Sequence, residues 1–576
     1  MLAWSLARPD EPKSIARFPL NLPEAQAFIP DFGPSIALSL DGTRMVYSGP
    51  ILQGEGWGAL WLRDFSELNG EEIAGVAGNV HVFSPDGQSI AFVGPDSRGV
   101  DGVQVQSLVG GPPRTLAEPR AGFPWSLDWE QDGYIYVQTR DGLERIPERG
   151  GDSELILPPD TTLDGYHFWT DVLPNGKGAI VSIVPNSEQL TSFNIGAADF
   201  ATGAVEVLVQ AVTGRYVRTG HLVFVRDDGV LLAAPFDQES LQITGAAVPL
   251  AQGISIGPTG GARFALSGNG TLVYGRGDPE NSFSEVVWVD GDGTARSVDS
   301  TWTGYFDRAV ASPDGSQLAV TTWQNGQYDV WIKELEHGPF MRLTFEGGRN
   351  PVWSPDGRTV AFLSVRGADG GRDLYLKAVD GSDDARLVLD ENRDIQEVQY
   401  APDGEWMVYA VGRGFDQDLR AFRPGVNSVG VDLVATSFDE RSPTVSADGR
   451  WLAYVSNESG RHEVYVRSFP DAGGGRVRVS TGSGHEPQWG RGGELFYLTD
   501  EPMMVAASMD LDSTPTVTSR RDLFSLRGFV RDFNRTTYSV APDGERLVMM
   551  RFHAGTPVEL VVVLNFFEEL KEKVGN

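Results

Sequence analysis

The chain has 576 residues, with 47 basic and 79 acidic side chains, a net charge of −32, and no cysteine. So negative a surface disfavours binding to nucleic acid and to anionic membranes, and the missing cysteine excludes disulfides, thiol catalysis and zinc sites built from cysteine. The length exceeds what one hydrophobic core supports and predicts at least two domains.

The N-terminal residues 1–12 are too short for a signal peptide, and they are similar to the end of a membrane helix followed by a polar exit. We therefore expect a stub at 1–12 and a natural gene that begins further upstream. No stretch of the chain reaches the roughly 18 apolar residues that a membrane-spanning helix needs. The expected location is the bacterial cell envelope, outside the cytoplasm. A cytoplasmic location stays open because no signal peptide is visible.

Twelve glycines recur at intervals of 42 to 51 residues, and most follow a turn sequence close to Ser-Pro-Asp-Gly. In such a turn Pro presets φ, Asp bonds the backbone two residues on, and Gly accepts a positive φ. The glycines are Gly42, Gly87, Gly133, Gly176, Gly220, Gly270, Gly315, Gly357, Gly404, Gly449, Gly493 and Gly544. The aspartates expected to have this structural role are Asp41, Asp86, Asp132, Asp314, Asp356, Asp403, Asp448 and Asp543.

Short alternating apolar runs follow each turn, as at 90–93, 318–320 and 360–363, and predict antiparallel strands. A repeat of about 40–50 residues made of such strands is typical of a β-propeller, with one blade per repeat. We count four strands per blade, and expect the Asp-Gly turn to join the innermost strand to the second.

The repeats also carry a longer period. The fifth and eleventh turns both lack the Asp before the Gly, and residues 231–237 resemble residues 504–510. Because propellers usually close with about 4–8 blades, twelve blades with this period predict an all-β protein of two tandem six-bladed propellers. The expected domains are 13–290 and 291–565, followed by a helical tail at 566–576.

The ends of the two halves predict how each ring closes. Residues 285–289 and 558–564 each stand where the third strand of the last blade of its own half should be. The fourth strands are then expected from residues 15–20 for the first ring and 295–298 for the second. Closure of this kind removes open sheet edges, which promote aggregation.

No catalytic or metal-binding pattern stands out. The segment Gly253–Gly257 matches a nucleophile elbow around Ser255, but that motif needs an α/β-hydrolase sheet, for which the repeats leave no room. The seven histidines show no metal-ligand spacing, and Asp290–Gly293 departs from the calcium-loop pattern after its first residues. We therefore expect no cofactor, no metal and no enzymatic activity.

Four residues are candidate ligand contacts at a channel mouth. Trp353, Tyr400 and Trp489 each lie on an expected innermost strand just before a turn, and His485 precedes such a strand. Aromatic side chains in these places would stack on sugars or peptides. Packing between blades is the alternative, and explains most aromatic residues of the chain.

The Ser-Pro-Asp-Gly turns resemble the WD-like PD repeats of TolB-type propellers. Residues 451–461, 463–466 and 564–571 are also similar to the C-terminal, extracytoplasmic propeller region of bacterial membrane-anchored serine/threonine protein kinases. The chain has no Gly-rich loop with a strand lysine, no His-Arg-Asp loop and no kinase lobe, so kinase activity is not implied.

This resemblance implies a non-catalytic sensor module that binds an unknown peptide, glycan or protein outside the cytoplasm. Two alternatives stay open. One is a TolB-like envelope scaffold; the other is a lyase or glycosidase that works in a propeller channel, which would need carboxylates or histidines converging at one mouth.

Overall fold

A computed structural model describes most of the chain. The described residues are 13–23, 26–28, 33, 35–49, 59–77, 80–95, 101–117, 124–139, 141–158, 165–185, 193–257, 260–277, 284–324, 327–336, 338–366, 371–391, 393–413, 416–427, 429–471, 473–531, 535–552 and 558–575. The expected stub at 1–12 lies outside them.

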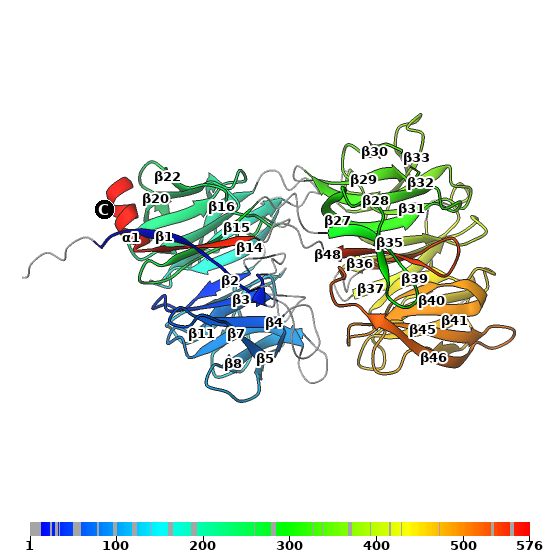
Figure 1. Cartoon of the computed structure of the whole chain (residues 1–576), viewed down its shortest axis with the longest axis horizontal. Helices are drawn as coiled ribbons and strands as arrows, with labels where there is room; N and C mark the ends of the chain where they lie inside the picture. Colours follow the sequence, from blue (N-terminus) through cyan, green and yellow to red (C-terminus); the bar gives the residue numbers. More distant parts are fainter. Residues whose placement is uncertain are drawn as a thin grey trace, which may run out of the picture.

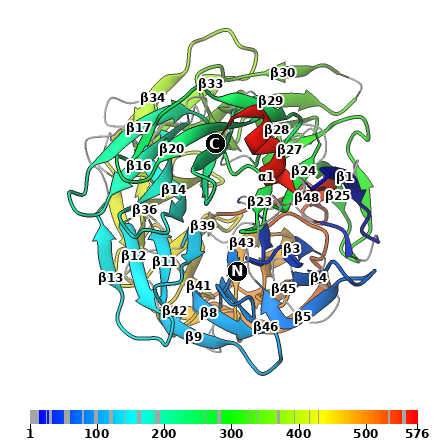
Figure 2. The same cartoon turned by 90° about the vertical axis from the view of Figure 1, so that its left-hand side faces the viewer.

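The described chain is all-β apart from 3-10 turns at Gln26 and Arg491–Gly493 and one helix near its end. Its sheets are antiparallel and nearly all four-stranded, and in all but the two closing sheets the strands follow each other in chain order. Figure 1 shows two groups of sheets side by side, and Figure 2 shows sheets following one another around a centre. The predicted all-β, propeller-like class is confirmed.

The first group contains six sheets. They are β2 (Ile36–Leu38), β3 (Arg44–Gly49), β4 (Ala59–Asp64) and β5 (Glu71–Ala77); β6 (His81–Phe83), β7 (Ser89–Pro95), β8 (Asp101–Ser107) and β9 (Arg114–Ala117); β10 (Ser126–Trp129), β11 (Tyr134–Thr139), β12 (Gly142–Pro147) and β13 (Glu154–Leu157); β14 (Gly165–Val172), β15 (Gly178–Pro185), β16 (Asn194–Asp199) and β17 (Val205–Gln210); β18 (Thr213–Val217), β19 (His221–Val225), β20 (Leu231–Asp237), β21 (Gln242–Ile243) and β22 (Val248–Ala251); and β23 (Phe264–Leu266), β24 (Leu272–Arg276), β49 (Glu559–Leu564) and β1 (Ala16–Leu20).

The second group lies between β24 and β49 in the sequence. Its sheets are β27 (Thr303–Ala311), β28 (Gln317–Gln324), β29 (Gln327–Glu334) and β30 (Phe340–Arg342); β31 (Arg349–Trp353), β32 (Thr359–Ser364), β33 (Asp373–Ala378) and β34 (Arg386–Leu389); β35 (Ile395–Tyr400), β36 (Met407–Arg413), β37 (Asp416–Phe422) and β38 (Val431–Val434); β39 (Glu440–Val445), β40 (Trp451–Ser456), β41 (Glu463–Ser468) and β42 (Arg476–Arg478); β43 (His485–Trp489), β44 (Glu494–Leu498), β45 (Met503–Asp510) and β46 (Thr516–Ser525); and β47 (Ser539–Val540), β48 (Leu547–Phe552), β25 (Ser284–Val289) and β26 (Ala295–Ser297), the last joined to β27 through a short pairing of β25.

The turns between the first two strands of the sheets share one conformation. All twelve repeated glycines have φ between 67° and 89°, a region that only glycine adopts without strain. In each of the eight turns that carry the aspartate, its Oδ1 accepts the backbone N–H two residues on. At Asp356, for example, Oδ1 accepts the Arg358 N–H at 3.1 Å and the Ser354 hydroxyl at 2.6 Å.

The third strands of the two closing sheets are exchanged relative to our expectation. The C-terminal strand β49 pairs with β24 of the first group, where Val273 lies opposite Val562. Strand β25 pairs with β48 of the second group, where Val287 lies opposite Met549. The prediction that each half supplies its own third strand is therefore wrong. The fourth strands are where they were expected, because β1 pairs with β49 and β26 pairs with β25.

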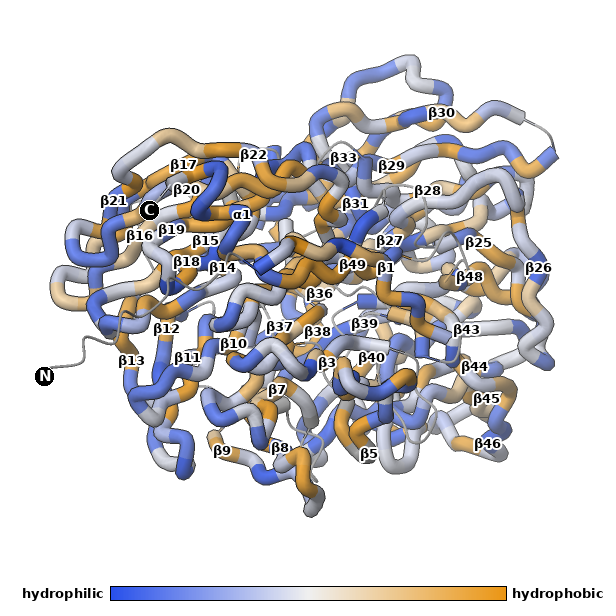
Figure 3. The backbone as a smooth tube through the Cα atoms, turned by 60° about the vertical axis from the view of Figure 1, so that its left-hand side comes forward, coloured by the Kyte–Doolittle hydropathy of each residue, from blue (hydrophilic) through white to orange (hydrophobic). Residues whose placement is uncertain are grey.

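Burial explains why the exchanged strand β49 is stable in the first group. Leu560 and Val562 are buried against the sheet of β2–β4, and Val561 and Val563 are buried against residues of β18–β20. Figure 3 shows this strand coloured mainly as hydrophobic. Burying one side chain of this size stabilises the folded state by about 1.5–3 kcal/mol. The four buried side chains together therefore stabilise the position of β49 in the first group.

The chain ends in helix α1 (Phe566–Lys573), which lies beside β1 on the first group (Figure 1). Phe566 and Leu570 are buried in the core. The Glu569 carboxylate accepts hydrogen bonds from Arg17 at 2.6 Å and from Lys573 at 2.8 Å. The described helices include none that is long and apolar enough to cross a membrane.

Candidate functional site

The three aromatic residues singled out in the sequence lie between neighbouring sheets. Trp353 is 5% exposed, and its indole N–H donates to the Val310 carbonyl of the preceding sheet at 3.0 Å. Trp489 makes the same kind of bond to Thr444, at 3.3 Å. Tyr400 packs against the hydrophobic core between the sheet of β31–β34 and the sheet of β35–β38, and burial raises its pKa to about 12. These placements favour packing; a ligand role for these three residues stays a prediction.

The fourth candidate, His485, lies in a different environment. It belongs to a set of charged and polar residues on the innermost strands of the second group and on neighbouring loops, which we call the polar centre. The polar centre consists of Asp307, Arg308, Arg349, Glu397, Asp439, Arg441, His462, His485, Glu486, Asp500, Arg531, Arg535, Thr536 and Thr537.

Ion pairs connect different sheets across the polar centre. Arg308 of β27 lies 3.1 Å from Glu397 of β35, and their side chains are only 2% and 1% exposed. Asp307 lies 3.2 Å from Arg349 and 3.3 Å from Arg535. Burial acts to raise the pKa of Asp307, but Arg535 and Arg349 outweigh it, so the pKa is lowered and the carboxylate stays charged.

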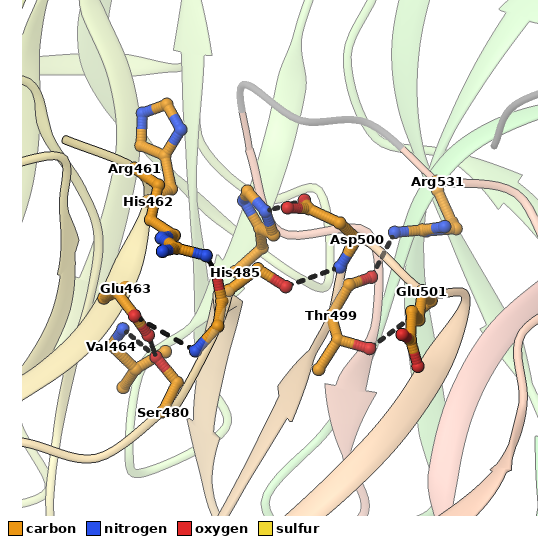
Figure 4. Close-up of polar contacts among 12 residues, drawn as sticks. Arg461, His462, Glu463, Val464, Ser480, His485, Thr499, Asp500, Glu501 and Arg531 are labelled. Carbon is orange, nitrogen blue, oxygen red and sulfur yellow. Dashed lines mark hydrogen bonds and ion pairs between the residues drawn. The ribbon is translucent and has the colours of Figure 1, made fainter. Parts of the chain in front are cut away.

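Two histidines of the polar centre have carboxylate partners, and Figure 4 shows one of these pairs, His485 with Asp500. His485 Nε2 is 2.7 Å from Asp500 Oδ1, and His462 Nε2 is 3.1 Å from Asp439 Oδ2, which also binds Arg441 at 2.6 Å. The two imidazole rings are 5.6 Å apart. The Asp500 side chain is 58% exposed, so this side of the polar centre opens to solvent.

Both histidines are neutral near neutral pH. Burial lowers the pKa of His485, although Asp500 acts in the opposite direction. Burial and then the Arg441 charge lower the pKa of His462 to about 4. A neutral imidazole offers one donor and one acceptor, so the pair is suited to hydrogen bonding with a ligand and to proton transfer.

The backbone of the polar centre contains three unusual residues. Asn350, Ser442 and Glu486 have φ of 54°, 51° and 51°, and each precedes a proline at a β-bulge of an innermost strand. Side chains rarely adopt such a φ, and residues that do so cluster at functional sites. At Glu486 the conformation is held by hydrogen bonds from the Thr537 N–H at 2.6 Å and hydroxyl at 2.9 Å to the carboxylate.

The structure gives no support to Ser255 as a nucleophile or to a metal centre. Ser255 is fully buried, and its hydroxyl accepts a hydrogen bond from the Arg263 guanidinium at 2.5 Å. In the part of the chain that the structure describes, no group of three or more His, Asp and Glu side chains is placed to hold a metal ion.

Most of the polar centre was missed in the sequence. The signal that would have found it is an arginine or histidine two positions before a proline at the start of an innermost strand, as in Arg349-Asn350-Pro351, Arg441-Ser442-Pro443 and His485-Glu486-Pro487. Only the third of these was noted, and only for its histidine.

Comparison with known proteins supports a TolB-type repeat. Residues 280–493 match the model of the TolB beta propeller domain. The chain is 26% identical over 204 residues to "Uncharacterized peptidase YuxL" of Bacillus subtilis, 29% identical over 175 residues to "Uncharacterized protein Atu1656" of Agrobacterium fabrum, and 29% identical over 115 residues to the Tol-Pal system protein TolB of Anaeromyxobacter dehalogenans. These matches cover 27%, 28% and 19% of this chain.

The chain spans less than two thirds of each of these relatives, namely 31% of YuxL, 56% of Atu1656 and 25% of TolB. Among solved structures, a putative TolB from Agrobacterium tumefaciens aligns with 47% of this chain and 99% of its own, at 19% identity and a TM-score of 0.40. The tricorn protease aligns with 94% of this chain and 63% of its own, at 12% identity and a TM-score of 0.31. With TM-scores this low, neither likeness supports a conclusion about function.

These relatives bear on two predictions, the absence of enzymatic activity and the family resemblance. The prediction that the chain is not an enzyme is contradicted, because the relatives include a protein named as a peptidase, which points to a hydrolase among the proteins that this chain resembles in part. The TolB-type part of the resemblance is supported. The relatives do not bear on its kinase-linked part.

Proposed function

We propose that this chain is a TolB-like binding protein of the bacterial cell envelope, in which the polar centre of the second group holds a peptide segment of a protein partner. A sensor role is a narrower form of the same proposal, with peptide binding as the sensed event. The match of residues 280–493 to the TolB propeller model supports the class, because it covers five of the six innermost strands of the second group.

The proposal includes two six-bladed rings. Each group has six sheets, and in each group the closing sheet combines strands from distant parts of the sequence. The strand pairing favours a first ring of 16–276 with 559–564 and a second ring of 284–552, in place of a division at 290/291. On this view the second ring is inserted between two neighbouring strands of the first.

The observation that carries the proposed function is the convergence of buried charges in the polar centre. Side chains with both signs of charge come there from five innermost strands, β27, β31, β35, β39 and β43, and burial strengthens each interaction that they make. Asp500 and His462 offer polar atoms at the open side. A peptide presents backbone N–H and C=O groups as well as charged side chains, and matches such a surface better than a uniformly anionic polymer does.

The test uses a phage-displayed library of random peptides, selected on the full chain. Binding of the selected peptides is then measured by fluorescence anisotropy with wild type, Asp500→Asn and His485→Gln, and with Asp383→Asn, an exposed carboxylate elsewhere on the second group, as the matched control. We expect at least about a tenfold loss of affinity in the first two variants, or about 1.4 kcal/mol, and none in the control. Equal affinities in all four proteins would contradict the proposal.

The peptidase relative favours a second candidate, hydrolysis of a peptide held at the same place. His485 with Asp500 has the arrangement of a general base and the group that orients it. The selected peptides, labelled at both ends, test this candidate directly. Turnover that is lost in His485→Gln and kept in Asp383→Asn would favour it over binding alone.

A further inference from the structure

We propose that the second group also contains a separate binding site, a pocket that takes a small organic anion with an apolar body. The pocket has a volume of about 450 Å³ and lies where the innermost strands β39, β43 and β47 end, among the turns that follow them. His485 of the polar centre begins β43, whereas Trp489 in the pocket wall ends it, so roughly 13 Å of strand separates the two places. Volumes of about 300–1,000 Å³ are usual for small-ligand pockets.

The pocket lies where two consecutive turns lack the side chains that the other turns carry. At a typical turn, Pro355 lies against Gly404 of the following turn. In the turn after β39, Ala447 occupies the place of this proline. The atoms nearest to Gly493 of the following turn belong to β45 and to the residue after that strand. The smaller alanine therefore leaves a hollow between these two turns.

The turn after β43 widens this hollow. Gly490 and Gly492 stand where the other turns carry a serine or alanine and an aspartate, so two further side chains are missing. Beside the hollow, Trp489 is only half-buried, although its indole bonds to the preceding sheet as that of Trp353 does. Trp353, which precedes a complete turn, is 5% exposed. The indole of Trp489 thus offers apolar surface to a ligand.

Arg491 gives the pocket a positive charge. Its side chain is exposed, lines the pocket and forms no ion pair with another residue in the described part of the chain. Its aliphatic stem lies against Gly544, which fixes the direction of the side chain. Asp448, the carboxylate of the lining, is paired with Arg450 at 2.7 Å and accepts the Ser446 hydroxyl at 2.6 Å. The charge of Arg491 is therefore not neutralised within the pocket.

These two features together define the class of ligand. The walls formed by Trp489, Leu511, Val540 and Pro542 suit an apolar body. The guanidinium of Arg491 suits a carboxylate, which it can bind through two parallel hydrogen bonds. An organic cation would be repelled by Arg491, and a small polar anion would leave the walls without a partner. An aromatic carboxylate satisfies both features, and it can come from a free acid or from the C-terminal residue of a peptide.

The experiment is isothermal titration calorimetry of the full chain with phenylacetate and with the tripeptide Ala-Ala-Phe, which represent these two sources. Phenethylamine, phenylethanol and acetate are probes that lack the negative charge or the ring. We expect saturable binding of at least one of the two carboxylates, at least about tenfold tighter than that of the three probes. The tighter of the two carboxylates identifies the source.

Two results of this titration would overturn the proposal. One is the absence of saturable heat with both aromatic carboxylates up to about 10 mM. The other is binding of phenethylamine or phenylethanol as tight as that of the carboxylates, because Arg491 would then have no role.

Three variants locate the ligand. Arg491→Gln removes the charge, and Ala447→Pro restores the residue that other turns carry and fills the hollow; each should weaken binding at least about fivefold. Arg358→Gln, at an exposed arginine beside another turn of the second group, is the matched control and should bind as wild type does. Circular dichroism and melting temperature check that each variant is folded. Wild-type affinity in folded Arg491→Gln or folded Ala447→Pro would contradict the assigned site.

Discussion

Arg276 and Glu559 lie opposite each other in the ladder of β24 and β49, with the guanidinium 3.7 Å from the carboxylate, although the whole second group separates them in the sequence. The chain therefore leaves the first group at the end of one strand and returns at the beginning of the neighbouring strand. Between these points β25 and β48 close the second group in the same way. Each group is complete only when the strand exchange is made.

This arrangement predicts that the second group can be removed without unfolding the first. Joining Arg276 directly to Glu559 through Asn-Gly would convert β24 and β49 into a two-residue hairpin, for which that dipeptide is favoured. We expect the shortened chain to be soluble and to unfold cooperatively, as measured by circular dichroism during heating.

The matched control is a chain of residues 13–290. It contains β25 without its partner β48 and lacks β49, so its closing sheet would have open edges. We expect this control to aggregate or to unfold without cooperativity. If the chain of residues 13–290 folds better than the shortened chain, the assignment of β49 to the first group is wrong.

Breaking the buried ion pair of Arg308 and Glu397 should destabilise the protein strongly, because one buried charge is then left without its partner. Glu397→Gln leaves the buried guanidinium without its charge partner, and we expect a loss of roughly 3–5 kcal/mol in the free energy of unfolding. The double variant Arg308→Met with Glu397→Leu removes both charges and should cost less than the single change. Urea unfolding measures the free energy of unfolding of wild type and both variants, and a loss in the double variant as large as that in Glu397→Gln would contradict this account.

Two substitutions in the turn at Asp356 and Gly357 separate the contribution of the side-chain hydrogen bonds to stability from that of the backbone conformation. Asp356→Ala removes the acceptor for the Arg358 N–H and the Ser354 hydroxyl and should cost about 1 kcal/mol. Gly357→Val should cost more than about 1–2 kcal/mol, since a β-branched residue resists the φ of 68°, while the nearest atom to a new Cβ is a comfortable 3.7 Å away. Equal melting temperatures for wild type and Gly357→Val would refute the turn assignment.

The raised pKa of Glu130 predicts that the stability of the folded protein depends on pH. Its ordinary pKa of 4.5 applies to the unfolded chain, and burial with the neighbouring carboxylates raises it to about 8 in the folded protein. Between these values the folded state keeps a proton that the unfolded state has lost, so this group reduces stability as pH rises from about 4.5 through about 8. The melting temperature of Glu130→Gln should therefore gain on that of wild type between about pH 5 and about pH 9. Parallel curves for the two proteins would show that Glu130 does not titrate in this range.

The repeat made most of the fold predictable. Turn chemistry around residues such as Gly315 and Gly357 is local, and the alternation of apolar residues identifies strands without any knowledge of their partners. Local patterns of this kind do not predict the partners of β25 and β49. Both strands are short and rich in valine, so either fits either closing sheet, and only packing over long sequence distances decides between them.

The candidate sites were less predictable for the same reason. Trp353 was singled out for its place before a turn, but its indole reaches back to the preceding sheet, a contact that depends on how two blades pack. Arg308 and Glu397 are unremarkable charged residues in the sequence. They become a buried pair because the beginnings of the innermost strands converge at one place.

The exchange of third strands is tested most directly by disulfide cross-linking, because the chain has no cysteine of its own. In a variant with Arg276→Cys, Phe552→Cys and Glu559→Cys, all three positions are exposed, and residues directly opposite in an antiparallel pair have Cα atoms about 4.5–5.5 Å apart, within the range of a disulfide. After mild oxidation, peptide mass spectrometry should find the bond between positions 276 and 559, with position 552 left as a free thiol. A bond between positions 552 and 559 instead would mean that β48 and β49 form a hairpin, and would contradict the account.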